Sequence, residues 1–231
     1  MLHDCQEGRK ILEANGLCCV RGDFTVFSDL EFSLPRGKAL VLRGPNGSGK
    51  STLIKAIAGL LPLLGGSLSC DGEEFTGDGD WISDNICYLA HKNALKGELT
   101  VQENIAFWAR LRGTGDRVVE AMIALGIDRL ADQPARYLSS GQGRRTALAR
   151  ILCHDASVWL LDEPTVGLDQ DGVQKLSRVM TSHLDSGGLI VTATHIDLAL
   201  PPERVVFLDM GAFSGGAASA GEDWFLSEVW S

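Results

Sequence analysis

The chain has 231 residues, 45% of them hydrophobic, so it can bury a core large enough for one α/β domain with a small inserted subdomain. Its formal charge of −9 disfavours a general nucleic-acid surface, and six cysteines without a Cys-x-x-Cys pair predict neither a zinc site nor a disulfide framework. No apolar run approaches the roughly 20 residues of a membrane-spanning helix, and the start has no signal-peptide core. We therefore expect a cytosolic protein, or one attached to a membrane only through partners.

The first part of the chain has the alternation of β-strands. Residues 1–10 are mixed polar, whereas apolar and polar side chains alternate over residues 11–20 and 24–34, on either side of a turn at 21–23. This pattern predicts an antiparallel β layer at the start of the domain.

Residues 44–51, Gly-Pro-Asn-Gly-Ser-Gly-Lys-Ser, match the G-x-x-x-x-G-K-[ST] phosphate loop at every required position. Residues 39–42 before the loop predict a strand, and residues 52–61 after it predict a helix, a context that a chance glycine-rich turn rarely has. The glycines let backbone N–H groups turn inward around an anion, and the helix N-terminus adds positive potential. We expect Lys50 to reach the β- and γ-phosphates and the Ser51 hydroxyl to hold Mg²⁺. The nucleotide-binding residues predicted in this segment are Gly44, Pro45, Asn46, Gly47, Ser48, Gly49, Lys50, Ser51 and Thr52.

The middle of the chain changes from strands to helices. Residues 67–72 predict a strand with a tight turn, residues 76–80 a polar loop and residues 86–89 a short apolar strand. Thr100 then has the features of an N-cap before an amphipathic helix, and residues 118–125 predict a second such helix. Nothing in these helices suggests a cofactor, so we expect them to pack for stability.

A second motif, Leu-Ser-Ser-Gly-Gln at residues 138–142, precedes a helical run and would, alone, be an ordinary N-cap. It is followed by the apolar run 158–161, which leads directly into Asp162 and Glu163. A strand that ends in aspartate presents a carboxylate at the C-terminal edge of a sheet, beside the Mg²⁺ that Ser51 would touch, and Glu163 is then placed to polarise the attacking water. The alternative, a solvated strand end, is a poor match for a run whose only polar group is one indole N–H.

The last motif of the chain is a histidine at a strand end. Asp169 lies in the turn after the two carboxylates, residues 173–184 predict a helix, and the last predicted strand, 189–194, ends in His195. A lone histidine there is usually structural. Because parallel strands expose equivalent ends, however, we expect His195 at the same sheet edge as Asp162, where its imidazole could contact the γ-phosphate.

Taken in order, the phosphate loop, Leu-Ser-x-Gly-Gln, the strand with Asp-Glu, Gly-Leu-Asp and the strand-end histidine resemble the ATP-binding subunit of an ABC transporter over roughly residues 11–208. The resemblance implies an α/β fold, a P-loop NTPase of ABC ATPase type, with a mostly parallel sheet, an antiparallel β layer and a helical subdomain. The implied division of the single domain 1–231 is a nucleotide-binding core at 1–90 and 152–231, a helical subdomain at 91–151 and a flexible C-terminal tail at 211–231.

The resemblance also implies a head-to-tail dimer with ATP sandwiched between two copies. The phosphate loop of one copy would hold the phosphates, while Ser139 and the Gly141 N–H of the other would donate to the γ-phosphate, and Asp169 is counted with this nucleotide site. Loss of the γ-phosphate on hydrolysis would let the two copies part. The implied catalytic residues are Glu163, His195 and Lys50, and the implied cofactors are ATP and Mg²⁺, with Ser51 and Asp162 as metal ligands.

Three positions depart from the pattern of the wider family. Ser140 replaces the commoner third-position glycine of the signature, which should have a mild effect if the backbone there is unstrained. His91 stands where most such domains have a glutamine that senses Mg²⁺ and water, and its imidazole could accept or donate a hydrogen bond there. Arg21 stands where an aromatic ring usually stacks on adenine, with Phe24 the nearest ring, so the choice between ATP and GTP stays open.

Within the family, the chain resembles the haem-exporter ATP-binding subunits of the cytochrome c maturation system, on the strength of residues 88–96, 99–104 and 138–145. This resemblance implies integral-membrane partner subunits at the cytoplasmic face of the inner membrane, where ATP hydrolysis serves haem handover to a periplasmic chaperone. Direct haem binding is not expected, because the histidines form no Cys-x-x-Cys-His motif.

Other functions stay open at this point. An ABC transporter ATPase for another solute is the first alternative. A soluble ABC-like ATPase acting on DNA or ribosomes usually has paired domains, coiled-coil insertions or basic arms, none of which this sequence contains, so no nucleic-acid partner is expected. A binding module without chemistry is disfavoured by the complete set of catalytic residue types. The apolar residues gathered in 222–230 predict a short helix folded onto this subunit, with docking to a partner as the alternative.

Overall fold

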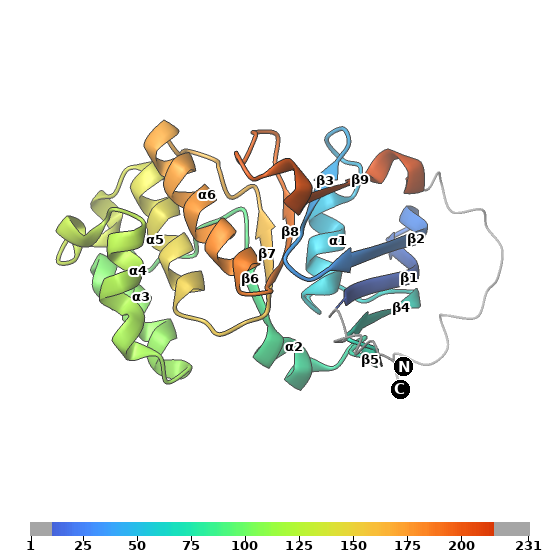
Figure 1. Ribbon diagram of the computed structural model, residues 1–231, viewed down its shortest axis with the longest axis horizontal. Helices are drawn as coiled ribbons and strands as arrows, with labels where there is room; N and C mark the ends of the chain where they lie inside the picture. Colours follow the sequence, from blue (N-terminus) through green and yellow to red (C-terminus); the bar gives the residue numbers. More distant parts are fainter. Residues whose placement is uncertain (1–10, 215–231) are drawn as a thin grey trace, which may run out of the picture.

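The computed structural model of the chain describes residues 11–214 and contains two β-sheets (Figure 1). One sheet is antiparallel, in the order β2-β1-β4-β5, and the other is parallel, in the order β6-β7-β8-β3-β9. The antiparallel strands are β1 (Ile11–Arg21), β2 (Phe24–Pro35), β4 (Gly65–Cys70) and β5 (Glu73–Glu74). The parallel strands are β3 (Ala39–Arg43), β6 (Ile86–Leu89), β7 (Val158–Asp162), β8 (Leu189–Ala193) and β9 (Val205–Asp209).

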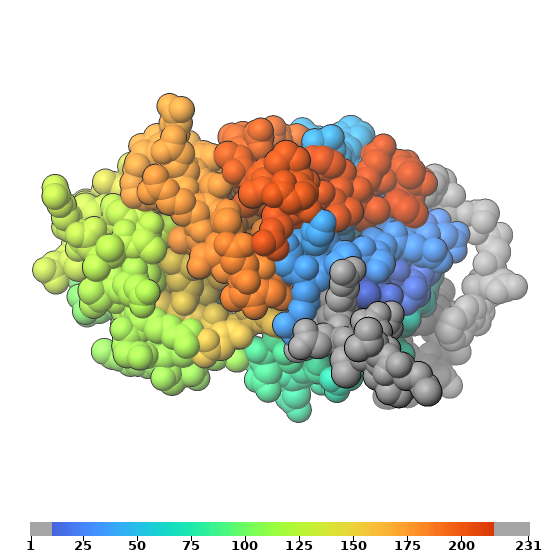
Figure 2. Space-filling model, in the orientation of Figure 1, coloured from blue at the N-terminus to red at the C-terminus, as the bar shows by residue number. Residues whose placement is uncertain are grey.

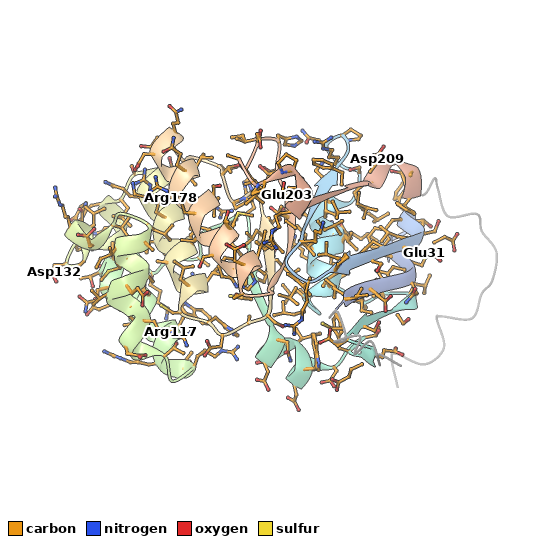
Figure 3. The ribbon with its side chains drawn as sticks, viewed as in Figure 1. Glu31, Arg117, Asp132, Arg178, Glu203 and Asp209 are labelled. Atoms are coloured by element: carbon orange, nitrogen blue, oxygen red, sulfur yellow. The ribbon has the colours of Figure 1, made fainter. Side chains whose placement is uncertain are left out.

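Helices cover both faces of the parallel sheet and gather at one end of the molecule. Figure 1 shows α3, α4, α5 and α6 on one side of the parallel sheet, and α1 between this sheet and the antiparallel one. The α-helices are α1 (Lys50–Ile57), α2 (Gly79–Asn85), α3 (Val101–Leu111), α4 (Val118–Ala124), α5 (Ser140–Leu152) and α6 (Gln170–Asp185). Figure 3 shows charged side chains at both extremes, with Arg117 and Asp132 at the helical end and Glu31 on the antiparallel sheet.

The core consists of two apolar clusters, one on each face of the parallel sheet. The central strands β7 and β8 are buried at every residue, as expected for parallel strands covered on both faces. Their odd and even side chains divide between the clusters, so Trp159 packs toward the helical side and Leu160 toward α1 and the antiparallel sheet. Because both of its faces are packed, the parallel sheet is a rigid support for the segments that follow the ends of its strands.

The register of the parallel sheet places three chain segments at one edge. Asp162, at the end of β7, is paired with Ala193 at the end of β8, and Ala193 is in turn paired with Leu42 of β3. The segments that follow these strands are the phosphate loop, the turn that begins at Glu163 and the turn that contains His195. The prediction that the two carboxylates and the histidine share a sheet edge is therefore consistent with the backbone register.

Four details of the sequence prediction were wrong. Helix α1 spans Lys50–Ile57 instead of residues 52–61, and α6 begins at Gln170 instead of residue 173, because Asp169 caps it. The polar run 76–80 is not only a loop, since Asp78 accepts hydrogen bonds from two backbone N–H groups and starts α2. The strand before His195 is not the last one, because β9 follows and pairs with β3.

Two further predictions concern the ends of the chain. The mixed polar start, 1–10, lies outside the described residues, and so does most of the predicted tail, including 222–230. Within residues 11–214, no helix is both long and apolar enough to cross a membrane.

Candidate functional site

The phosphate loop connects β3 to α1 at the sheet edge described above. Gly49 precedes the helix with φ 91°, and a Cβ there would lie 2.9 Å from Cγ1 of Val26, so both the backbone angle and the space require glycine. The ammonium of Lys50 donates to the carbonyl oxygens of Gly44 at 2.8 Å and Pro45 at 2.9 Å. Lys50 is thus held within the loop that it was predicted to serve, which Figure 2 shows at the upper edge of the molecule, in light blue beside the orange-red segment that follows β8.

The two predicted metal ligands are in direct contact. The Ser51 hydroxyl donates to Oδ1 of Asp162 at 2.8 Å, although the residues lie far apart in the sequence. Asp162 is only 3% exposed, so its carboxylate faces the loop and not bulk solvent. The Ser48 hydroxyl is also buried, and it has no hydrogen-bond partner in the described part of the chain. An oxygen donor set of this kind fits Mg²⁺, which prefers carboxylate and hydroxyl oxygens together with substrate phosphates.

Glu163 and His195 form a second pair beside the first. Oε1 of Glu163 lies 3.6 Å from Nε2 of His195, and the Glu163 side chain is 20% exposed while that of His195 is 60% exposed. The backbone N–H of Glu163 donates to Ala193 at 2.9 Å, which ties the two strand ends together. Glu163 has φ 50°, in the left-handed region that non-glycine residues rarely adopt. The pair is open to solvent on the histidine side and can accept a substrate from that direction.

The signature residues form the start of α5. The Ser139 hydroxyl accepts from the Gln142 N–H at 3.2 Å and the Gln142 side chain accepts from the Ser139 N–H at 2.9 Å, a complete capping box. A Cβ on Gly141 would lie 2.5 Å from the carbonyl oxygen of Gly167, so the turn after β7 packs directly on this tip. Ser140 has an ordinary helical backbone, which is the condition on which the predicted mild effect of this residue depends. Among the described residues, no hydrogen bond joins the tip to the phosphate loop of the same chain.

The other predicted nucleotide contacts lie at the periphery. Arg21 and Phe24 are paired across the β1–β2 turn and both are exposed, Phe24 at 66%. Asp169 caps α6 by accepting from the Gly172 N–H at 2.9 Å and forms an ion pair with Arg145. The Gly172 N–H and the Arg145 guanidinium hold the pKa of Asp169 below its usual value, so this carboxylate is ionised at neutral pH. These contacts are structural ones and leave the predicted nucleotide roles of the three residues as predictions.

Comparison with known proteins identifies the family. Residues 27–166 match the family model described as ABC transporter. The chain is 44% identical over 204 residues to the cytochrome c biogenesis ATP-binding export protein CcmA of Paramagnetospirillum magneticum, covering 86% of this chain and 94% of that protein. It is also 44% identical to the CcmA of Nitrobacter winogradskyi, over 82% of this chain and 94% of that one. The chain belongs to the CcmA family of ABC transporter proteins.

Solved structures agree with this CcmA-family fold. A putative ABC transporter ATP-binding protein from Pyrococcus furiosus superimposes with a TM-score of 0.76 at 25% identity, over 88% of this chain and 99% of that one. A nucleotide-free ATP-binding cassette from an ABC transporter gives a TM-score of 0.73 at 21% identity, over 87% of this chain and 88% of that one, and bears on the fold alone. The predicted ABC ATPase fold and the predicted family are confirmed, and membership of the family implies ATP binding.

One residue at the site of this CcmA-family chain was missed by the sequence prediction. Arg144, on α5, is 2% exposed, and its guanidinium donates to acceptors from two separate segments. The acceptors are the carbonyl oxygens of Asp162 at 2.7 Å, Glu163 at 2.8 Å, Pro164 at 3.3 Å, Ala90 at 2.8 Å and His91 at 3.3 Å, and Oδ1 of Asn93 at 3.0 Å. Burial lowers the pKa of Arg144 to about 10, against the raising effect of Asp162 and Glu163, so it remains a cation at neutral pH. The available signal was an arginine two residues after the signature, on the helix face that also carries buried Ala147 and Leu148.

Proposed function

We propose that the chain is the ATP-hydrolysing subunit of a membrane complex that exports haem, or hands it over, in cytochrome c biogenesis. The observation that carries the proposal is the pair of adjacent carboxylates at the end of β7, with Asp162 bonded to Ser51 and Glu163 beside His195. The relatives at 44% identity are named as cytochrome c biogenesis ATP-binding export proteins, and this gives the biological setting.

The loop residues would bind the phosphates of ATP. Backbone N–H groups of residues 44–51 and the start of α1 provide the anion site, and the Lys50 ammonium neutralises charge on the β- and γ-phosphates. Ser51 and Asp162 would hold Mg²⁺, which neutralises charge that develops on the phosphoryl oxygens. Most of the rate enhancement would then come from positioning and electrostatic stabilisation by these groups.

Glu163 would act on the attacking water. Its carboxylate can accept a hydrogen bond from that water and so orient one lone pair of the water toward the γ-phosphorus. His195, 3.6 Å away and more exposed, would contact the γ-phosphate and limit the rotation of Glu163. The two proposed roles differ because the two side chains have different neighbours: the Asp162 carboxylate bonds Ser51 of the phosphate loop, and the Glu163 carboxylate lies beside His195.

Hydrolysis would need two copies of the chain. The tip formed by Ser139 and Gly141 has no bond to its own phosphate loop in residues 11–214, and Ser139 is exposed, which supports its use as a donor to the γ-phosphate held by a second copy. Asp169, next to this tip through Arg145, would lie at the same dimer interface. Arg21 and Phe24 are proposed to contact the base, and His91 the metal-bound water.

The remaining proposals concern organisation and partners. We assign residues 91–151 to a helical subdomain and residues 1–90 and 152–231 to the nucleotide-binding core. The chain would act at the cytoplasmic face of the inner membrane, bound to integral-membrane subunits, and would bind neither nucleic acid nor haem directly. The charge of −9 supports the exclusion of nucleic acid.

The test uses Glu163→Gln in the full-length protein purified from detergent-solubilised membranes. We expect kcat for ATP to fall by about 10²–10⁴-fold and an ATP-bound dimer to accumulate in gel filtration. Glu120→Gln, an exposed glutamate on α4, is the matched control and should hydrolyse ATP at the wild-type rate. Equal hydrolysis by wild type and Glu163→Gln would refute the assignment of the water-activating group.

A second experiment separates haem from other solutes. Cells that produce only the Glu163→Gln protein should lose haem-stained c-type cytochromes, whereas the Glu120→Gln protein should restore them. Normal c-type cytochromes in the Glu163→Gln cells would instead favour the alternative, an ABC transporter ATPase for another solute.

A further inference from the structure

Arg144 links two segments of the active site through one buried guanidinium. Nη2 and Nε donate to the three consecutive carbonyl oxygens at the end of β7, from residues 162–164, while Nη1 donates to the segment 90–93 that follows β6. The strands that lead into these segments, β6 and β7, are paired in the parallel sheet as far as Leu89 and Leu161. Arg144 therefore fixes the relative position of two loops beyond the point where the sheet holds them.

The bonds at this site depend on the shape of the guanidinium. Its five N–H donors lie in one plane and in fixed directions, whereas a lysine has three donors on one rotating nitrogen. A buried cation is stable only if it is well paired, and here each of the three guanidinium nitrogens, Nε, Nη1 and Nη2, donates to at least one carbonyl oxygen. Shortening this side chain would leave several buried carbonyl oxygens without a donor.

One of the carbonyl groups that Arg144 holds belongs to a strained residue. Glu163, with φ 50°, adopts a left-handed conformation that is unfavourable for an L-residue, and such residues persist where several surrounding contacts hold them. Three hydrogen bonds fix its peptide groups: its N–H donates to Ala193, and its carbonyl oxygen accepts from Val166 at 3.2 Å and from Arg144 at 2.8 Å. The Arg144 bond is the only one of the three that comes from the helical side.

We propose that Arg144 is a positioning residue for ATP hydrolysis: it holds the left-handed backbone of Glu163, which aims the carboxylate at the attacking water, and locks the segment that carries His91 to it. This inference rests on the proposed role of Glu163. Arg144 bonds the site residues Asp162, Glu163 and His91 only at their backbone carbonyl oxygens, and within the described residues it has no hydrogen bond to the phosphate loop. Its effect therefore passes through Glu163 and the segment 90–93.

The structure provides a matched control on the same helix. Arg150 is half-buried on α5, and its Nη1 donates to the carbonyl oxygens of Asn93 at 3.0 Å and Ala94 at 3.3 Å. It has no hydrogen bond to residues 162–164. Loss of Arg150 should therefore disturb packing and the same loop without releasing Glu163.

The experiment compares Arg144→Gln, Arg144→Lys and Arg150→Gln in full-length protein purified from detergent-solubilised membranes. We measure kcat, KM for ATP in the presence of Mg²⁺, and the affinity for the fluorescent nucleotide TNP-ATP. For Arg144→Gln we expect kcat to fall at least about tenfold, because a misplacement of about 1 Å can cost about 10²-fold, with KM and TNP-ATP affinity within about twofold of wild type. Arg144→Lys should recover part of kcat, and Arg150→Gln, which disturbs the same loop but leaves the bonds to residues 162–164, should lower kcat less than Arg144→Gln does.

A double variant tests the path through Glu163. In single-turnover cleavage of ATP, adding Arg144→Gln to Glu163→Gln should lower the rate by less than about twofold, because the group that it positions is already gone. A tenfold further loss in the Glu163→Gln background would overturn the inference and leave Arg144 a general structural residue. A kcat for Arg144→Gln that is no lower than the kcat of Arg150→Gln would also overturn the inference. If instead Glu163→Gln alone hydrolyses ATP like wild type, the proposed function fails, and this outcome is read from the single variant.

Folding of the variants is controlled separately. If Arg144→Gln does not bind TNP-ATP, the comparison rests on Arg144→Lys and on Asn93→Ala, which removes one acceptor of Arg144 from a half-buried loop position. Both should lower kcat by about threefold or more at unchanged KM. Wild-type kcat in both variants would overturn the inference.

Discussion

Gly141 offers a direct test of how the signature tip is held. A Cβ at this position would lie 2.5 Å from the carbonyl oxygen of Gly167 and 3.5 Å from its carbonyl carbon. Because a Cβ is essentially never found within 3.0 Å of another heavy atom, Gly141→Ala must separate the two backbones by about half an ångström or more. Both sides of the contact are backbone, so no side-chain rotation can relieve it. Overpacking of this kind costs about 1–3 kcal/mol.

Two measurements follow from this magnitude. A loss of about 2 kcal/mol should lower Tm by about 4–8 °C in a chain of this size, as measured by differential scanning fluorimetry. Displacement of the tip should also lower kcat for ATP, with little change in KM, because the phosphate loop is untouched. Gly115→Ala is the control, since the nearest heavy atom to its Cβ would be Cγ of Arg110 at 4.0 Å. We expect Gly115→Ala to have the Tm and kcat of wild type. If Gly141→Ala also had the wild-type Tm and kcat, the tip would not be packed against Gly167 as described.

Three further predictions concern the metal site, a helix cap and acid stability. Ser51→Ala leaves Asp162 without its partner, so the Mg²⁺ concentration that gives half-maximal ATPase activity should rise at least about tenfold, and an unchanged value would exclude Ser51 as a ligand. Thr100→Ala removes the acceptor of the Glu103 N–H, so it should cost about 1 kcal/mol and lower Tm by about 2–4 °C at unchanged KM. Burial lowers the pKa of His183 in the folded protein to about 4. Between pH 6.5 and pH 4 the unfolded chain therefore binds a proton that the folded chain does not bind, so the free energy of unfolding decreases by roughly 3 kcal/mol as the pH falls through this range. His183→Phe should therefore move the midpoint of acid unfolding, followed by circular dichroism, to lower pH.

The elements that the sequence predicted correctly have signals that are local and continuous. The strand 158–162 is apolar throughout, and the phosphate loop has glycines at positions where the backbone needs them. Once these strands are parallel, the meeting of Asp162 and Ser51 at one edge follows from the register of the sheet.

The elements that were missed depend on partners elsewhere in the chain. Strand β9 is the exception, because its apolar run Val205–Asp209 is a local signal that the prediction did not use; it lies at the sheet edge, is half exposed and pairs with β3. Helix α2 is short and begins in a run of glycine and aspartate, and it is held by the stacking of Trp81 on Phe75 with ring centroids 4.1 Å apart. Arg144 was missed for the same reason, because its acceptors come from two segments that only the folded chain brings together.

The left-handed turn at Glu163 explains how two adjacent carboxylates can serve one site in different ways. In a continuing strand, successive side chains point to opposite faces, so Glu163 would be directed away from the edge that Asp162 occupies. At φ 50° the strand stops instead, and the carboxylate of Glu163 turns toward His195 while that of Asp162 stays on Ser51. The hydrogen bonds from Arg144 and to Ala193 hold this conformation in the described structure. The proposed separation of metal binding from water activation therefore depends on one backbone angle, and whatever loosens that angle should reduce hydrolysis while nucleotide binding persists.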